Sequence, residues 1–123
     1  MTTLVSKKPI YIVDDDESVC RALSLLLNTY GFTVGTFGSA EAFFGMTPKG
    51  EPGCVILDLH MPGLNGWQAL EHLVKIKSPH SVIIISAEKS EGLQDKAVKA
   101  GALGFLQKPF NDKDLVELIN KAD

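Results

Sequence analysis

The sequence YIVDDDE, residues 11–17, carries a short apolar run directly into four acidic residues. The run begins at Ile10, and a continuous apolar run of this length is typical of a strand buried on both faces. Acidic groups that lie close together raise one another's pKa and cost free energy unless a cation neutralises them. Taken alone, the acids favour a solvated turn over a site for a hard cation such as Mg²⁺, because runs of charge usually face solvent.

Strand and helix patterns alternate along the rest of the chain. Strands are predicted at residues 10–13, 32–37, 54–59, 82–86 and 104–107, with a stretch of helical spacing after each. Continuous apolar strands indicate a parallel sheet covered by helices on both faces, and right-handed crossovers restrict such a sheet to doubly wound forms. We therefore predict an α/β fold in which five parallel strands alternate with five helices.

Several helices have a recognisable first residue. The expected caps are, in chain order, Asp16 or Glu17, Ser39, Asn65 and Asn111. Gln68, three residues after Asn65, completes the pattern of a capping box. The fourth helix, predicted over residues 91–100, has the weakest pattern, because Gly92 lies inside it and glycine lowers helix propensity.

The composition indicates one globular domain. The chain has 123 residues, 45% of them hydrophobic, and we divide it into an N-terminal tail over residues 1–8 and a domain over residues 9–123. A net charge of −3 argues against a duplex-binding surface on this segment, so no direct contact with nucleic acid is expected. Neither a signal peptide nor a membrane-spanning run is visible, and we predict a cytoplasmic protein without membrane contact.

Cysteine and histidine show no zinc-site spacing. Cys20 and Cys54 lie far apart in apolar stretches, which predicts two small buried core residues in a reducing compartment. His72 and His80 are expected at the surface, on or just after the third helix, and Lys8 is expected in the solvated tail.

Polar residues follow the predicted strands at their carboxyl ends, where ligands bind in doubly wound sheets. Asp14 and Asp15 follow the first strand, Asp58 lies in the third, Ser86 closes the fourth and Lys108 follows the fifth. A carboxylate can attack phosphorus to give an aspartyl-phosphate, and Mg²⁺ offsets the repulsion between nearby acids and a phosphoryl group. A hydroxyl and a lysine can bind the remaining phosphoryl oxygens. This set therefore favours a magnesium site over a merely solvated turn.

Four motifs occur in order: VDDD (13–16), ILDLHMPGLNGW (56–67), IIISA (83–87) and GFLQKPF (104–110). With them, the chain resembles the receiver domains of two-component response regulators, from about Pro9 to Lys121. The resemblance implies the flavodoxin-like fold, with strand order 2-1-3-4-5. Its motifs are most similar to those of receivers that precede a helix-turn-helix DNA-binding effector.

The resemblance also implies a role for each residue at the strand ends. Asp58 matches the phosphoacceptor, and Ser86 and Lys108 match the pair that binds the phosphoryl oxygens. The Mg²⁺ ligands would be Asp14, Asp15, Asp58 and the backbone carbonyl of His60. Ser86 and Phe105 match the two switch residues, and Lys108–Pro109 matches a peptide bond that is usually cis in this family.

The implied partners are a sensor histidine kinase or phosphotransfer protein, a C-terminal DNA-binding output domain absent from this chain, and a second copy in a phosphorylation-dependent homodimer. Such a domain catalyses its own phosphorylation and slow dephosphorylation and is not an enzyme with a separate substrate. An aspartate-nucleophile phosphohydrolase is a second hypothesis, although those enzymes generally carry a second acid where this chain has His60. A flavin-binding module is a third, although it needs a hydroxyl-rich phosphate loop after the first strand. A pseudo-receiver that only binds partners is a fourth, which the complete set of acids, serine and lysine disfavours.

Overall fold

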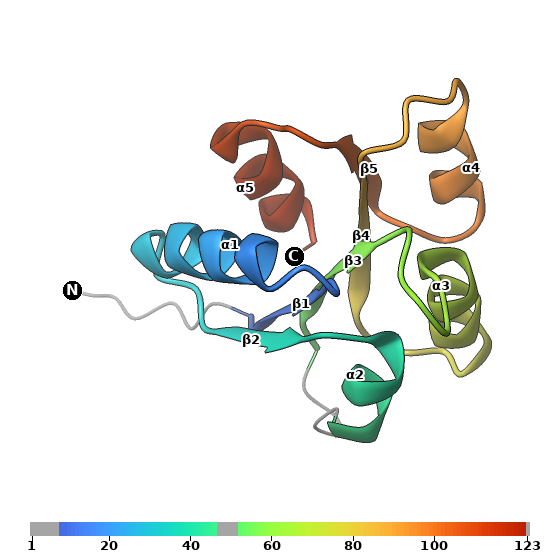
Figure 1. The fold of residues 1–123 in the computed structure, drawn as a ribbon, viewed down its shortest axis with the longest axis horizontal. Helices are drawn as coiled ribbons and strands as arrows, with labels where there is room; N and C mark the ends of the chain where they lie inside the picture. Colours follow the sequence, from blue (N-terminus) through green and yellow to red (C-terminus); the bar gives the residue numbers. More distant parts are fainter. Residues whose placement is uncertain (1–7, 47–51, 123) are drawn as a thin grey trace.

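The alternation of strands and helices predicted from the sequence is present in the computed structural model, which describes residues 8–46 and 52–122 (Figure 1). Its elements are β1 (Ile10–Val13), α1 (Glu17–Thr29), β2 (Val34–Phe37), α2 (Ala40–Met46), β3 (Cys54–Asp58), α3 (Gly66–Lys75), β4 (Ser81–Ser86), α4 (Leu93–Lys99), β5 (Gly104–Gln107) and α5 (Asp112–Lys121). Part of the predicted loop over residues 46–53 lies outside the described residues.

All neighbouring strands of the sheet are parallel, in the order β2-β1-β3-β4-β5. Helices α1 and α5 cover one face, and α2, α3 and α4 cover the other (Figure 1). The predicted doubly wound fold and its strand order are therefore confirmed. The chain order reverses where β1 meets β3, and in such sheets this point is where ligands bind beyond the carboxyl ends of the strands.

The central strands are buried because both faces of the sheet carry helices, and successive side chains point to opposite faces. Ile12 and Ile56 pack in the cluster of α1 and α5, whereas Val13 and Leu57 pack in the cluster of α2, α3 and α4. Cys20 and Cys54 are buried as predicted, and burial raises the pKa of the Cys54 thiol to about 12. The Cys54 side chain is therefore a neutral core group at physiological pH.

Three predicted caps have the expected geometry. Asp16 accepts hydrogen bonds from the N–H groups of Ser18 and Val19 at the start of α1. The capping box of Asn65 and Gln68 starts α3, and the Asn111 side chain accepts from Asp114 N–H at 2.9 Å. In addition, the Ser39 hydroxyl accepts from Ala42 N–H at 3.0 Å, beside α2.

Two predicted boundaries differ from the structure. The strand predicted from residue 32 begins at Val34, because Phe32 N–H donates to the Leu27 carbonyl and closes the end of α1 instead. The fourth helix begins at Leu93, because Gly92 has a φ of 81° and stands outside the helix as its N-cap. No helix among residues 8–46 and 52–122 is long and apolar enough to cross a membrane.

Two predicted surface residues are partly buried. The Lys8 ammonium donates to the Ala122 carbonyl at 2.7 Å, so this residue is joined to the end of α5. The His80 ring lies edge-on to Tyr11, with centroids 5.4 Å apart, and its Nδ1 accepts a hydrogen bond from Gly53 N–H at 3.0 Å. His80 is therefore only partly exposed, where an exposed surface residue was predicted, because this hydrogen bond and the Tyr11 contact hold the ring against the edge of the core.

Candidate functional site

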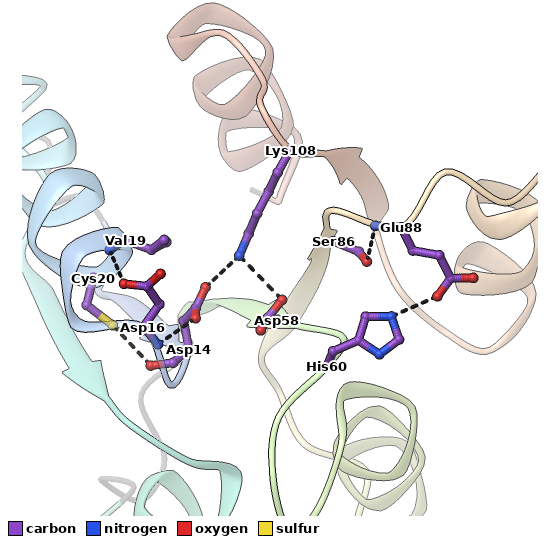
Figure 2. A network of polar contacts seen from close by, with 9 residues as sticks. All are labelled: Asp14, Asp16, Val19, Cys20, Asp58, His60, Ser86, Glu88 and Lys108. Atoms are coloured by element: carbon purple, nitrogen blue, oxygen red, sulfur yellow. Dashed lines mark hydrogen bonds and ion pairs between the residues drawn. The ribbon is translucent and has the colours of Figure 1, made fainter.

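The sheet register brings the predicted site residues to one edge. Val13 pairs with Leu57, so Asp14 and Asp58 emerge side by side from β1 and β3. Asp58 pairs with Ile85, which places Ser86, the last residue of β4, next along the same edge. Figure 2 shows Lys108 reaching from the end of β5 to a position between Asp14 and Asp58.

The carboxylates form a compact oxygen cluster. Oxygen atoms of Asp14, Asp15 and Asp58 lie within 4.8 Å of one another. Asp14 and Asp58 are buried, whereas Asp15 is exposed, so the cluster opens to solvent on one side. Mg²⁺ prefers oxygen ligands and keeps several waters. An all-oxygen set with an open side fits that preference.

Asp14 also organises the turn that follows β1. Its Oδ1 accepts a hydrogen bond from Asp16 N–H at 2.9 Å, and its backbone carbonyl accepts one from Cys20 Sγ at 3.3 Å. These contacts fix the start of α1 relative to the cluster. Burial and the nearby Asp14 charge raise the pKa of the Cys20 thiol, which favours its neutral form.

Lys108 supplies a positive charge to the cluster. Its Nζ lies 3.0 Å from Asp14 Oδ2 and 3.5 Å from Asp58 Oδ1. Burial alone would lower the pKa of Lys108, but its hydrogen bond to Asp14 and the charges of Asp14 and Asp58 raise it above the ordinary value. The backbone of Lys108 is held as well, since its N–H donates to the Ser86 carbonyl at 2.7 Å. The Lys108–Pro109 peptide bond is cis, as the family resemblance implied.

Asp58 lies in an environment that disfavours its charge. Burial raises the pKa of its carboxyl, and the neighbouring Asp14 raises it further, while Lys108 acts in the opposite direction. An additional cation at the cluster would favour the ionised carboxylate, which is the nucleophilic form.

The two predicted switch residues lie on neighbouring strands. Ser86 is fully buried, and its Oγ accepts a hydrogen bond from Glu88 N–H at 3.0 Å. Phe105 pairs with Ile84 in the sheet and is half-buried against the core cluster that includes Leu93 and Ala97 of α4. The two residues therefore both adjoin the segment that leads into α4.

One contact at the mouth of the site was not predicted from the sequence. His60 Nε2 lies 2.7 Å from Glu88 Oε1 (Figure 2). Ser90 Oγ donates to Glu88 Oε2 at 2.6 Å. The Ser90 hydrogen bond and then the His60 hydrogen bond lower the pKa of Glu88, so Glu88 is a carboxylate and the His60 ring donates to it. His60 and Glu88 are 28 positions apart, and no local pattern links them.

Comparisons with known proteins agree with the geometry. The family model described as the response regulator receiver domain matches residues 10–120. The transcriptional regulatory protein FixJ of Bradyrhizobium diazoefficiens is 37% identical over 119 residues, which cover 97% of this chain and 58% of that protein. The response regulator protein TmoT of Ectopseudomonas mendocina is 40% identical over 113 residues, which cover 92% of this chain and 51% of that protein. The chain thus spans about half the length of these curated relatives.

Solved structures give the same result. The crystal structure of FixJ-N superposes with a TM-score of 0.87 at 35% identity, covering 96% of this chain and 94% of that one. The response regulator StyR superposes with a TM-score of 0.87 at 36% identity, covering 95% of this chain and 59% of that one.

Proposed function

The chain belongs to the family of response regulator receiver domains, and from this premise we propose that Asp58 accepts a phosphoryl group from a phosphohistidine. The observation that carries the assignment is the position of Asp58, whose carboxylate lies within 4.8 Å of oxygens of Asp14 and Asp15 and 3.5 Å from the Lys108 ammonium. A carboxylate that is surrounded in this way can attack phosphorus while cationic groups balance the charge that develops.

The proposed reaction forms one bond and breaks one bond. A carboxylate oxygen of Asp58 attacks the phosphorus atom, and the bond from phosphorus to the histidine nitrogen of the donor breaks, leaving its electron pair on that nitrogen. Lys108, whose ammonium lies 3.5 Å from Asp58, would bind a phosphoryl oxygen, and the Ser86 hydroxyl, at the end of the neighbouring strand, would donate to another. Mg²⁺, held by Asp14, Asp15, Asp58 and the backbone carbonyl of His60, would neutralise charge between the carboxylates and the phosphoryl group.

The donor would be a sensor histidine kinase or a phosphotransfer protein, and the phosphorylated domain would catalyse its own slow dephosphorylation. The output would be a C-terminal DNA-binding domain, because relatives such as FixJ are transcriptional regulators about twice as long as the region matched here. A phosphorylation-dependent homodimer remains part of the proposal, as does a cytoplasmic location, to which two free buried thiols are suited.

The alternative functions are less compatible with the site. A phosphohydrolase of the aspartate-nucleophile type would use a second acid at position 60, where His60 is instead hydrogen-bonded to Glu88. A flavin phosphate would meet the carboxylates of Asp14 and Asp15 where a flavodoxin offers hydroxyl groups.

The assignment can be tested with acetyl phosphate as the donor and intact mass as the measurement. We expect one base-labile phosphoryl group on the wild-type chain with Mg²⁺, none on Asp58→Asn, and a markedly higher Mg²⁺ requirement for Asp15→Ala. Asp16→Asn is the matched control, because it removes a neighbouring acid but keeps an N-cap side chain. Undiminished phosphorylation of a folded Asp58→Asn variant would overturn the assignment.

A further inference from the structure

Two side-chain contacts join the segment leading into and through α4 to the segment that runs from the end of β3 into the first turn of α3. The first is the hydrogen bond from His60 Nε2 to Glu88 Oε1, at 2.7 Å. The second places the Lys96 ammonium over the ring of Trp67, 4.3 Å from the ring centroid. In each case one partner belongs to the chain between Asp58 and the first turn of α3, and the other follows Ser86.

The two contacts start from one segment of the chain. Both carboxylate oxygens of Glu88 are engaged, one by His60 and the other by the Ser90 hydroxyl. The Lys96 ammonium interacts with the face of Trp67, so Glu88 and Lys96 each contribute one contact from the segment that leads into and through α4.

The segment that these contacts hold has little intrinsic stability. Helix α4 has seven residues, and its N-cap is Gly92, which makes no side-chain capping hydrogen bond. Helices this short are marginal without tertiary packing, and here Leu93 and Ala97 are the buried residues of the helix. The position of α4 therefore depends on its tertiary contacts, those of the buried Leu93 and Ala97 together with those at the surface.

The same segment carries the hydrogen bond that ties Ser86. Glu88 donates its backbone N–H to Ser86 Oγ at 3.0 Å, while the Glu88 side chain is held by His60. If Ser86 moves toward a phosphoryl group on Asp58, Glu88 must follow or release it. Movement of Glu88 would stretch its contact with His60, and a shift of α4 would withdraw Lys96 from Trp67.

We propose that Glu88 and Lys96 are positioning residues whose contacts with His60 and Trp67 hold α4 in its unphosphorylated arrangement. These two contacts, called the clasp below, would break when Ser86 binds the phosphoryl group. The inference rests on the proposed role of Asp58. The His60 side chain is 64% exposed and that of Glu88 is 33% exposed, so solvent weakens their pairing. An exposed hydrogen-bonded side-chain pair and an exposed cation–π contact each change an equilibrium by about two- to fivefold, so the clasp should change it by roughly tenfold.

The test uses Lys96→Met, because the loss of charge alone and the opening of the clasp should change the affinity for beryllofluoride in opposite directions. Beryllofluoride with Mg²⁺ is the probe of the phosphorylated arrangement, and its half-saturating concentration is read from Trp67, the single tryptophan of the chain. Removal of a positive charge should weaken anion binding by charge alone. Opening of the clasp should instead strengthen it, by about threefold for Lys96→Met and roughly tenfold when Glu88→Ala is added.

Two further variants control the measurement. Lys99→Met removes an exposed lysine from the same helix and should not strengthen binding. Lys96→Arg keeps a cation over the ring and should restore the wild-type value. Without beryllofluoride, the backbone amide signals of Leu93–Lys99 in the double variant should move toward their positions in the beryllofluoride-bound wild type.

The clasp is refuted if the double variant keeps wild-type amide positions and wild-type affinity, or if Lys96→Arg behaves like Lys96→Met. A different outcome addresses the proposed function. If beryllofluoride binds Asp58→Asn as well as it binds the wild type, the role of Asp58 fails and the clasp fails with it.

Discussion

Replacement of Lys108 with methionine removes the ammonium group that lies 3.0 Å from Asp14 and 3.5 Å from Asp58. Methionine keeps a flexible apolar stem of similar length, so the main change is the loss of charge. The three carboxylates of the cluster, which lie within 4.8 Å of one another, would then repel one another without this compensation.

The magnitude follows from the burial of the partners. The Lys108 side chain is 23% exposed, whereas those of Asp14 and Asp58 are 1% and 9% exposed. Loss of one partner from a fully buried pair costs about 3–5 kcal/mol, and an exposed pair contributes less than about 1 kcal/mol. A partly solvated lysine between two buried acids lies between these limits, so we expect the free energy of unfolding to fall by about 2 kcal/mol in the absence of metal.

Magnesium should recover part of that loss. A divalent cation neutralises the same carboxylates, and it stabilises the folded state according to its affinity. The variant should therefore bind Mg²⁺ more tightly than the wild type, and about 1 kcal/mol should be regained at saturation. Urea unfolding followed by Trp67 fluorescence, with EDTA and with Mg²⁺, measures both quantities, and Lys99→Met serves as the control. A loss below about 0.5 kcal/mol in EDTA, or an equal loss in Mg²⁺, would refute this reasoning.

Two other predictions concern stability away from the lysine. Burial lowers the pKa of His80 below the usual histidine value of 6.5, so the neutral ring stabilises the fold above that pH and the contribution is lost as the pH falls. His80→Asn keeps an acceptor for Gly53 N–H but does not titrate. In urea unfolding from pH 7.5 to about 5.5, the variant should lose less stability per pH unit than the wild type, by at most about 1.4 kcal/mol per pH unit. Equal pH dependence of the two proteins would contradict this prediction. A Cβ on Gly66 would lie 2.6 Å from the Asp58 carbonyl oxygen, so Gly66→Ala should cost about 1–3 kcal/mol and slow phosphorylation of Asp58. A Cβ on Gly45 would have nothing within 4 Å, so Gly45→Ala should neither lower the stability nor slow phosphorylation. Equal effects of the two substitutions would count against this explanation.

The fold was predictable because its signals are local. The apolar runs of β1, β3 and β4 are continuous, and strands buried on both faces need no alternation of polar and apolar residues. The cluster of carboxylates was predictable from a topological rule, since residues at the carboxyl ends of neighbouring parallel strands share one edge of the sheet. Neither inference required knowledge of any side-chain conformation.

Other features depend on side-chain conformation and could not be read from the sequence. The contact of His60 with Glu88 and that of Lys96 with Trp67 each join residues of different loops and helices, and their spacing follows no period. His80 follows a polar turn, which favours a surface position. Its ring is nevertheless partly buried, because it packs against Tyr11 and accepts a hydrogen bond from Gly53 N–H.

Phosphorylation can move α4 only if the contacts that hold it are weaker than those that the phosphoryl group adds. A phosphoryl oxygen that accepts a hydrogen bond from Ser86 contributes about 1.5–3 kcal/mol, since one partner is charged. The contacts of Glu88 and Lys96 are exposed to solvent, which screens them, so they are weaker than that gain. A buried ion pair in their place would cost several kcal/mol to break, and α4 would then stay fixed after phosphorylation. Strands β3 and β4 are buried along nearly their whole length, so the movement should be confined to the segment from Ser86 through α4 and to Phe105, which packs against the same core cluster as Leu93 and Ala97.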